Sequence, residues 1–98
     1  MTLAAIQNWS KRRDKLVIMA EIVGIARNGT SKTHIMFKAH LSFSQINQYL
    51  KLLPRIGLLE KSAYKGKVIY KATQKGLDFM EKQKQIIDML NEDVTETN

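Results

Sequence analysis

Residues 31–76, SKTHIMFKAHLSFSQINQYLKLLPRIGLLEKSAYKGKVIYKATQKG, decide the fold of this chain. Near their middle, Ser42 is followed three residues later by Gln45, the spacing of a capping box at a helix start. Behind this start, apolar residues recur at helical spacing and predict one buried face: Phe43, Ile46, Leu50 and Leu53. Pro54 cannot donate to a helical ladder, so we expect the helix to end before Gly57.

Helix and hairpin signals flank this central helix. Before it, Thr30 or Ser31 provides a cap for a short helix with three apolar positions, Ile35, Met36 and Ala39. After it, two β-prone runs flank residues 64–67, where Gly66 allows the backbone to reverse sharply. The pattern predicts two helices in close succession, followed by a β-hairpin.

A longer helix is predicted on each side of this region. Residues 10–29 have a cap in Ser10, a stop at Asn28-Gly29 and a wide apolar face between them. That face consists of Leu16, Ile18, Met19, Ala20, Ile22, Val23, Ile25 and Ala26. The last helix is capped by Thr73 and is expected to end at Leu90. Its apolar positions are Leu77, Phe79, Met80, Ile86, Ile87 and Leu90.

Three helices, a two-stranded hairpin and a closing helix give the element order of a winged helix-turn-helix. The predicted fold class is therefore mainly α with a small β-hairpin (α+β). With 98 residues, the chain has material for one modest core, which we assign to residues 10–90. Residues 1–9 are interpreted as an N-terminal arm, and residues 91–98 as an acidic tail that has nothing to bury and is expected to be disordered.

The charge of the chain is high and unevenly distributed. There are 16 Lys and Arg against 9 Asp and Glu, a net charge of +7. Residues 1–75 hold 14 basic and 3 acidic side chains, a net of +11, whereas residues 76–98 hold 2 and 6, a net of −4. A basic body of this size favours a polyanionic partner, because each neutralised phosphate releases counterions. The alternative is that Lys and Arg only keep a small domain soluble.

Residues 35–43, IMFKAHLSF, together with GLLE at 57–60 and YKATQKG at 70–76, resemble the archaeal winged-helix DNA-binding proteins that dimerise through their last helix. The resemblance covers residues 11 to about 90. It implies binding to double-stranded DNA, a recognition helix that begins near Ser42, a wing around residues 65–67 and a homodimer. The expected closing helix, 17 residues from 74 to 90 and about 25 Å long, is sufficient only for a compact helix-to-helix dimer.

The recognition helix supplies the residues that we expect nearest the DNA bases. Gln45, Asn47 and Gln48 carry side-chain amides, which pair bidentately with adenine in the major groove. Polar residues also occupy any solvated helical face, and Gln45 has an alternative role in the cap alone. The expected phosphate contacts of this helix are Ser42, Ser44 and Lys51.

Basic residues outside the recognition helix complete the predicted DNA surface. Lys65 and Lys67 suit the phosphate backbone or a minor groove from the wing tip, the alternative being a charged hairpin that prevents edge pairing. The short positioning helix and the start of the first helix contribute the remaining predicted contacts: Lys32, Thr33, Lys38, Arg12 and Arg13. For Arg12 and Arg13 the alternative is an ordinary solvated charge run.

The second half of the closing helix has apolar residues that a small body does not need. We predict a dimer interface formed by Phe79, Ile86, Ile87 and Leu90. The alternative is that this end folds back onto the first helix or onto Leu3, Ile6 and Trp9 of the arm.

Catalytic and membrane functions are not indicated. His34 and His40 are six residues apart, which does not place both imidazoles on one helical face, and we expect both at the surface or in loops. Without cysteine there is no thiolate site, and no apolar run approaches the roughly 18 residues that cross a bilayer. We therefore expect no enzyme activity, metal, cofactor, small-molecule ligand or membrane partner.

Two functions remain. The first is a cytoplasmic, nucleoid-associated DNA-binding protein that regulates transcription or organises the chromosome. The second is a winged-helix module that docks on other proteins and does not bind DNA.

Overall fold

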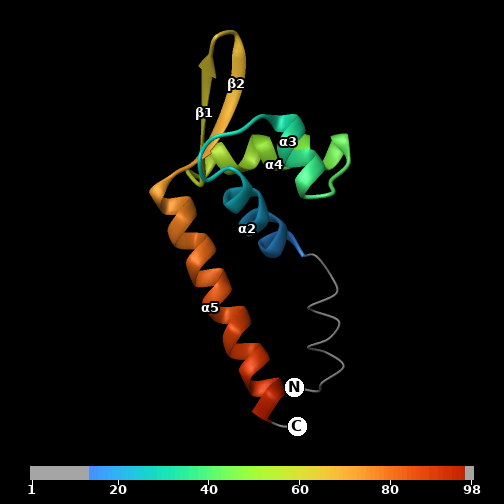
Figure 1. Ribbon diagram of the computed structural model, residues 1–98, viewed down its shortest axis with the longest axis vertical. Helices are drawn as coiled ribbons and strands as arrows, with labels where there is room; N and C mark the ends of the chain where they lie inside the picture. Colours follow the sequence, from blue (N-terminus) through green and yellow to red (C-terminus); the bar gives the residue numbers. More distant parts are fainter. Residues whose placement is uncertain (1–13, 97–98) are drawn as a thin grey trace.

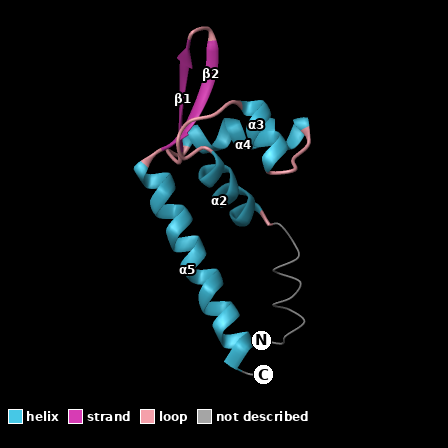
Figure 2. Ribbon diagram, in the orientation of Figure 1, coloured by secondary structure: helices cyan, strands magenta, loops and turns pink. Residues whose placement is uncertain are grey.

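The computed structural model describes residues 14–96 and gives the elements the order of a winged helix (Figure 1). The elements are α2 (Lys15–Ile25), α3 (Lys32–Lys38), α4 (Phe43–Arg55), β1 (Leu59–Tyr64), β2 (Lys67–Ala72) and α5 (Gln74–Glu96). The hairpin projects from one end of the body, and α5 runs from the hairpin base past α2 toward the other end (Figure 2). The predicted α+β winged helix-turn-helix fold is confirmed.

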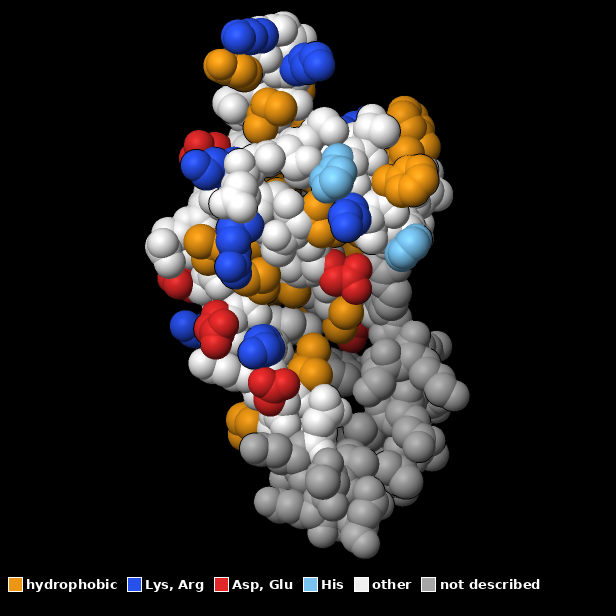
Figure 3. Space-filling model, in the orientation of Figure 1, with side chains coloured by type: hydrophobic (Ala, Val, Ile, Leu, Met, Phe, Trp, Pro, Cys, Tyr) orange, Lys and Arg blue, Asp and Glu red, His pale blue; other side chains and the backbone are white. Residues whose placement is uncertain are grey.

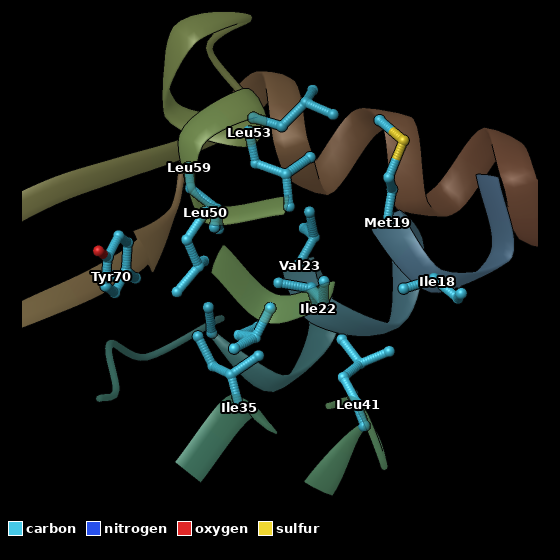
Figure 4. Packing of buried hydrophobic residues seen from close by; sticks show 14 residues of the cluster. Ile18, Met19, Ile22, Val23, Ile35, Leu41, Leu50, Leu53, Leu59 and Tyr70 are labelled. Carbon is cyan, nitrogen blue, oxygen red and sulfur yellow. The ribbon is translucent and has the colours of Figure 1, made fainter. Parts of the chain in front are cut away.

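The three helices α2, α3 and α4 and the two strands each contribute buried side chains to one hydrophobic core (Figure 4). Its fully buried large side chains are Ile22 and Val23 from α2, Ile35 from α3, Ile46 and Leu53 from α4, and Leu59 from β1. Tyr70 of β2 is buried at the hairpin base. Ala39 and Leu41, on either side of the turn between α3 and α4, are buried in the same core, so the turn is packed against it.

Local hydrogen bonds fix the start of each helix. Ser31 Oγ accepts from the backbone N–H of His34 at 3.2 Å, which selects Ser31 from the two predicted caps. Ser42 Oγ accepts from the N–H of Gln45 at 3.1 Å, while Gln45 Oε1 accepts from the N–H of Ser42 at 2.9 Å, so the predicted capping box is confirmed. Thr73 Oγ1 accepts from the N–H of Gly76 at 3.0 Å, which confirms Thr73 as the cap of α5.

The start of α2 differs from the prediction at Ser10. Asp14 has an extended backbone, and its carboxylate accepts from the N–H of Val17 at 3.0 Å. Asp14 is therefore the cap, and α2 begins at Lys15. Ser10 and the predicted arm, residues 1–9, lie outside the described residues.

The hairpin forms a short antiparallel ladder with Tyr64 opposite Lys67 at its tip. Lys65 and Gly66 connect the strands with φ angles of 50° and 78°. Positive φ at both central residues is the geometry of the two-residue turn that matches strand twist. At the other end of the ladder, Thr30 pairs with Tyr70, which joins the hairpin to the loop before α3.

The closing helix is longer than predicted. α5 extends to Glu96, so the predicted end at Leu90 is wrong, and residues 91–96 of the predicted disordered tail belong to the helix. No Gly or Pro follows Leu90, and acidic and polar residues do not interrupt the backbone hydrogen bonds of a helix. With 23 residues the helix is about 35 Å long, so the premise of a short closing helix also fails.

Two predicted core residues are exposed instead. Leu16 and Phe43 have 50% and 65% of their surface accessible. Each lies in the first turn of its helix, beyond the edge of the core that the following turns bury. At the other end of α4, Pro54 is accommodated in the last turn, and the helix ends before Gly57 as predicted.

Candidate nucleic-acid interface

α4, the predicted recognition helix, has one buried face and one polar face. Ile46, Leu50 and Leu53 point into the core. Ser44, Gln48 and Lys51, spaced by four and three residues, are exposed on the other side. The helix is therefore anchored along its whole length and presents a row of hydrogen-bonding groups and a cation to a partner.

The three predicted base-contacting amides differ in availability. Gln45 Oε1 accepts the N–H of Ser42, so this side chain is held in the cap, the alternative considered for it. Asn47 is half-buried, at the margin of the polar face. Gln48 is exposed and, of the three, is the residue best placed to meet a partner in front of the helix.

The wing tip carries the two predicted lysines. Lys65 and Lys67 are both exposed, and basic side chains stand at the far end of the hairpin (Figure 3). The ammonium of Lys65 lies 5.4 Å from the ring centroid of Tyr64, a cation–π distance. The hairpin and the α3–α4 pair lie at the same end of the molecule (Figure 1).

The predicted contacts on α3 are distributed around a short helix. Thr33 and Lys38 are exposed, and Ser42, ahead of α4, is exposed as well. Lys32 is half-buried, and its ammonium lies over the ring of Phe43, 4.4 Å from the centroid. Arg12 and Arg13 lie outside the described residues.

Two exposed aromatic residues were missed by the sequence analysis. Phe37 and Phe43 have 78% and 65% of their surface accessible, and hydrophobic side chains gather at the end of the body where α3 and α4 meet (Figure 3). The signal for Phe37 was present in its spacing, because it stands two residues after the buried Ile35 and so on the opposite side of α3. Phe43 is the first residue after the cap, a position that periodicity alone does not separate from the buried stripe.

An open groove of about 650 Å³ lies between α2 and α3, lined by Glu21, Gly24, Ile25, His34, Lys38 and His40. His34 and His40 are both exposed. Across residues 14–96, no group of three or more His, Asp and Glu side chains is arranged to hold a metal ion. Within the same residues, no helix combines the length and the apolar character that a membrane span needs.

The predicted dimer residues lie on two sides of α5. Phe79 is half-buried and packs against the core, while Ile87 and Leu90 are half-buried farther along. Ile86 and Met89 have 52% and 63% of their surface accessible. The last helix thus presents large apolar side chains to solvent beyond the body.

Comparison with known proteins supports the fold. The sequence signature of the winged helix-turn-helix family matches residues 12–91. No curated protein sequence matches the chain.

Solved structures give the same result. The Sulfolobus solfataricus DNA-binding protein Sso10a-2 is 24% identical over 87% of this chain and 96% of that chain, with a TM-score of 0.70. MepR, a transcription regulator of a Staphylococcus aureus multidrug efflux pump, is 13% identical over 97% and 74%, with a TM-score of 0.76. TubR of Bacillus thuringiensis serovar israelensis, bound to 24 bp of tubC, is 16% identical over 82% and 92%, with a TM-score of 0.63. At these identities the likeness is one of fold.

Proposed function

The chain belongs to the winged helix-turn-helix family, and from this premise we propose that it binds duplex DNA as a homodimer and regulates transcription or organises the chromosome. In this proposal, α4 enters the major groove and the wing contacts the phosphate backbone or the minor groove. The protein then acts in the cytoplasm, associated with the nucleoid.

One observation carries the proposal: the polar face of α4 and the lysine-tipped hairpin are exposed at the same end of the molecule. Gln48 and Lys51 extend from the middle of α4, and Lys65 and Lys67 from the wing. Base edges and phosphates need these two kinds of group, amides for the first and cations for the second. The net charge of +11 on residues 1–75 supports the same partner.

The printed descriptions of the similar structures are consistent with this proposal. The Sulfolobus protein is described as DNA-binding, MepR as a transcription regulator, and TubR as bound to 24 bp of tubC. These proteins share the fold with this chain. The argument that this chain also binds DNA comes from the exposed residues of α4 and the wing.

Salt-dependent binding to a labelled duplex tests the proposal. If about 6 phosphates are neutralised, the logarithm of affinity falls with a slope near −5 against the logarithm of salt concentration. Lys65→Ala with Lys67→Ala should weaken binding to all sequences and make the slope shallower by about 2. Gln48→Ala should instead relax preference at particular base pairs.

A matched pair of lysines on α5 serves as the control. Lys82 and Lys84 are exposed on the closing helix, away from the wing and α4. Their double replacement by Ala should leave the slope almost unchanged. A flat salt response of the native protein, or equal effects of the two double variants, contradicts the proposed interface.

The homodimer is proposed from the apolar side chains that α5 leaves exposed. Ile86 and Met89 lie on the second half of the helix, where α2 no longer runs beside it (Figure 1). Phe79 lies seven residues before Ile86 and continues this side toward the body. Two α5 helices that pair along this side cover the exposed surface of both chains.

A protein-docking module is the second candidate, and the exposed Phe37 and Phe43 favour it. Exposed aromatic side chains are enriched at protein interfaces. This function predicts that the protein binds duplex DNA only weakly. It also predicts that Lys65→Ala with Lys67→Ala does not change the affinity for the partner protein. The DNA titration described above therefore separates the two candidates.

A further inference from the structure

We propose that Phe43 contacts the 5-methyl groups of thymine in the major groove and gives this protein a preference for A·T-containing DNA. The inference deepens the proposed DNA-binding function and rests on it. It concerns a residue whose periodicity predicted burial in the core and whose ring is instead exposed to solvent.

The position of Phe43 on α4 is the first part of the argument. Phe43 is the first residue of α4 after the Ser42 cap, and 65% of the surface of this residue is accessible. Asn47 follows four residues later and Lys51 eight residues later, so the three lie along one side of the helix. Asn47 and Lys51 form the edge of the polar face that lies nearest Phe43, so a helix that turns this edge to DNA brings Phe43 to the same groove.

The contact with Lys32 is the second part. The ammonium of Lys32 lies 4.4 Å from the centroid of the Phe43 ring and comes from a different helix, α3. A cation at this distance is attracted to the ring face and limits the rotation of the side chain. The ring is thus held beside a positive charge suited to a phosphate, while most of its surface stays open to a partner.

The chemistry of the groove identifies the partner. The major-groove edges of base pairs present donors and acceptors, and the thymine methyl is the apolar group among them. The neighbours of Phe43 are polar or basic, namely Ser44, Asn47 and Lys32, whereas the centre of a protein interface is depleted of charged residues. A ring that carries a cation on its face in such surroundings fits a single methyl group in a polar groove better than an extended apolar partner.

The test removes only the methyl group. Binding is measured to a short A·T-rich duplex and to the identical duplex with deoxyuridine in place of thymidine, at one salt concentration. The native protein should bind the thymine duplex more tightly, by about fourfold for each methyl that packs on the ring. Phe43→Ala should bind both duplexes equally, and Phe43→Leu, which keeps an apolar side chain, should retain part of the preference.

Leu52→Ala is the matched control. Leu52 is a partly exposed apolar residue toward the C-terminal end of α4, nine positions after Phe43, and at about 3.6 residues per turn it faces the opposite side. This variant should keep the native preference for thymine. Circular dichroism checks that each variant is folded.

The outcomes are distinct. Equal binding of the native protein to both duplexes, with its salt dependence intact, overturns the thymine contact and leaves the DNA-binding proposal standing. If Phe43→Ala loses the same affinity for both duplexes, the ring contacts sugar or phosphate, and the thymine contact is overturned. A Phe43→Ala variant that still prefers the thymine duplex overturns the thymine contact as well. Failure of the native protein to bind duplex DNA at all contradicts the proposed function itself.

Discussion

α4 and α5 are both amphipathic, but α4 buries the middle of its apolar face within the described body, whereas α5 leaves apolar residues exposed along its second half. Ile46, Leu50 and Leu53 are all buried, whereas Phe43 and Leu52, nearer the two ends of the helix, are exposed. α5 packs against α2 along its first half, yet leaves Ile86 and Met89 exposed along its second half. The first helix belongs to a closed core, and the second has apolar surface in excess of it.

This difference separates two uses of the same pattern. Apolar residues in α4 stabilise the monomer, and their polar neighbours are free to face a ligand. Apolar residues late in α5 add little to the monomer, since exposed side chains gain nothing from burial. Their effect is expected on assembly, and the variants below are chosen to separate assembly from folding.

The largest effect is expected from charges placed on the exposed side of α5. Ile86→Asp with Met89→Asp should convert a dimer into a monomer that remains helical. Burial of the exposed part of these two side chains in each of two chains is worth on the order of 5 kcal/mol before the cost of association is subtracted. Light scattering should give the mass of two chains for the native protein and of one chain for the variant.

Val68→Asp is the control for this experiment. Val68 is a partly exposed apolar residue of the wing, distant from α5, and its replacement should leave the mass unchanged. A native protein with the mass of one chain, or a double variant that remains dimeric, contradicts the interface.

The next effect in size comes from the buried face of α4. Ile46 has no accessible surface, and Ile46→Ala should reduce the free energy of unfolding by about 2–5 kcal/mol through lost burial and the cavity left behind. Ser44→Ala on the exposed face of the same helix should change it by less than about 0.5 kcal/mol. Urea denaturation measures both; equal losses would mean that the two faces of α4 do not differ as the burial indicates.

Features of the fold that depend on residues close together in the sequence were predicted correctly. The capping box of Ser42 and Gln45 and the cap of Thr73 each span three residues, and the turn at Lys65-Gly66 spans two, so local spacing predicted them. Periodicity identified the buried and polar faces of α4 for the same reason. These features required no knowledge of what packs against them.

The failures come from contacts between distant segments. Phe43 has the spacing of a core residue, and only the position of α2 and α3 shows that the core stops short of it. Lys32 reaches the Phe43 ring from another helix, which no local pattern encodes. The end of α5 was placed at Leu90 because the sequence turns acidic and polar there, although no Gly or Pro follows that would stop the helix. Of the candidate site, the polar residues were therefore predictable, and the aromatic one was not.

The smallest expected effect on stability comes from Gln83, a buried polar residue near the middle of α5. Gln83 is 7% exposed, and its Nε2 is buried without a hydrogen-bond partner among the described residues. It stands between Met80 and Ile87 with spacings of three and four residues, the arrangement of a packed seam. A buried donor without a partner costs stability, so Gln83→Met, which keeps the shape and removes the amide, should raise the free energy of unfolding by about 1 kcal/mol.

Gln85 provides the matched control for Gln83, because it is the same residue type on the same helix and is exposed. Gln85→Met should leave the free energy of unfolding unchanged, and both variants should be compared at one protein concentration, since assembly also contributes to stability. A loss of stability in Gln83→Met would mean that its amide is paired in the folded protein. If that loss were to disappear in the Ile86→Asp, Met89→Asp background, the partner of Gln83 would belong to the second chain. In that case, α5 would form the dimer along both of its sides, and its contrast with α4 would be larger than the exposed residues indicate.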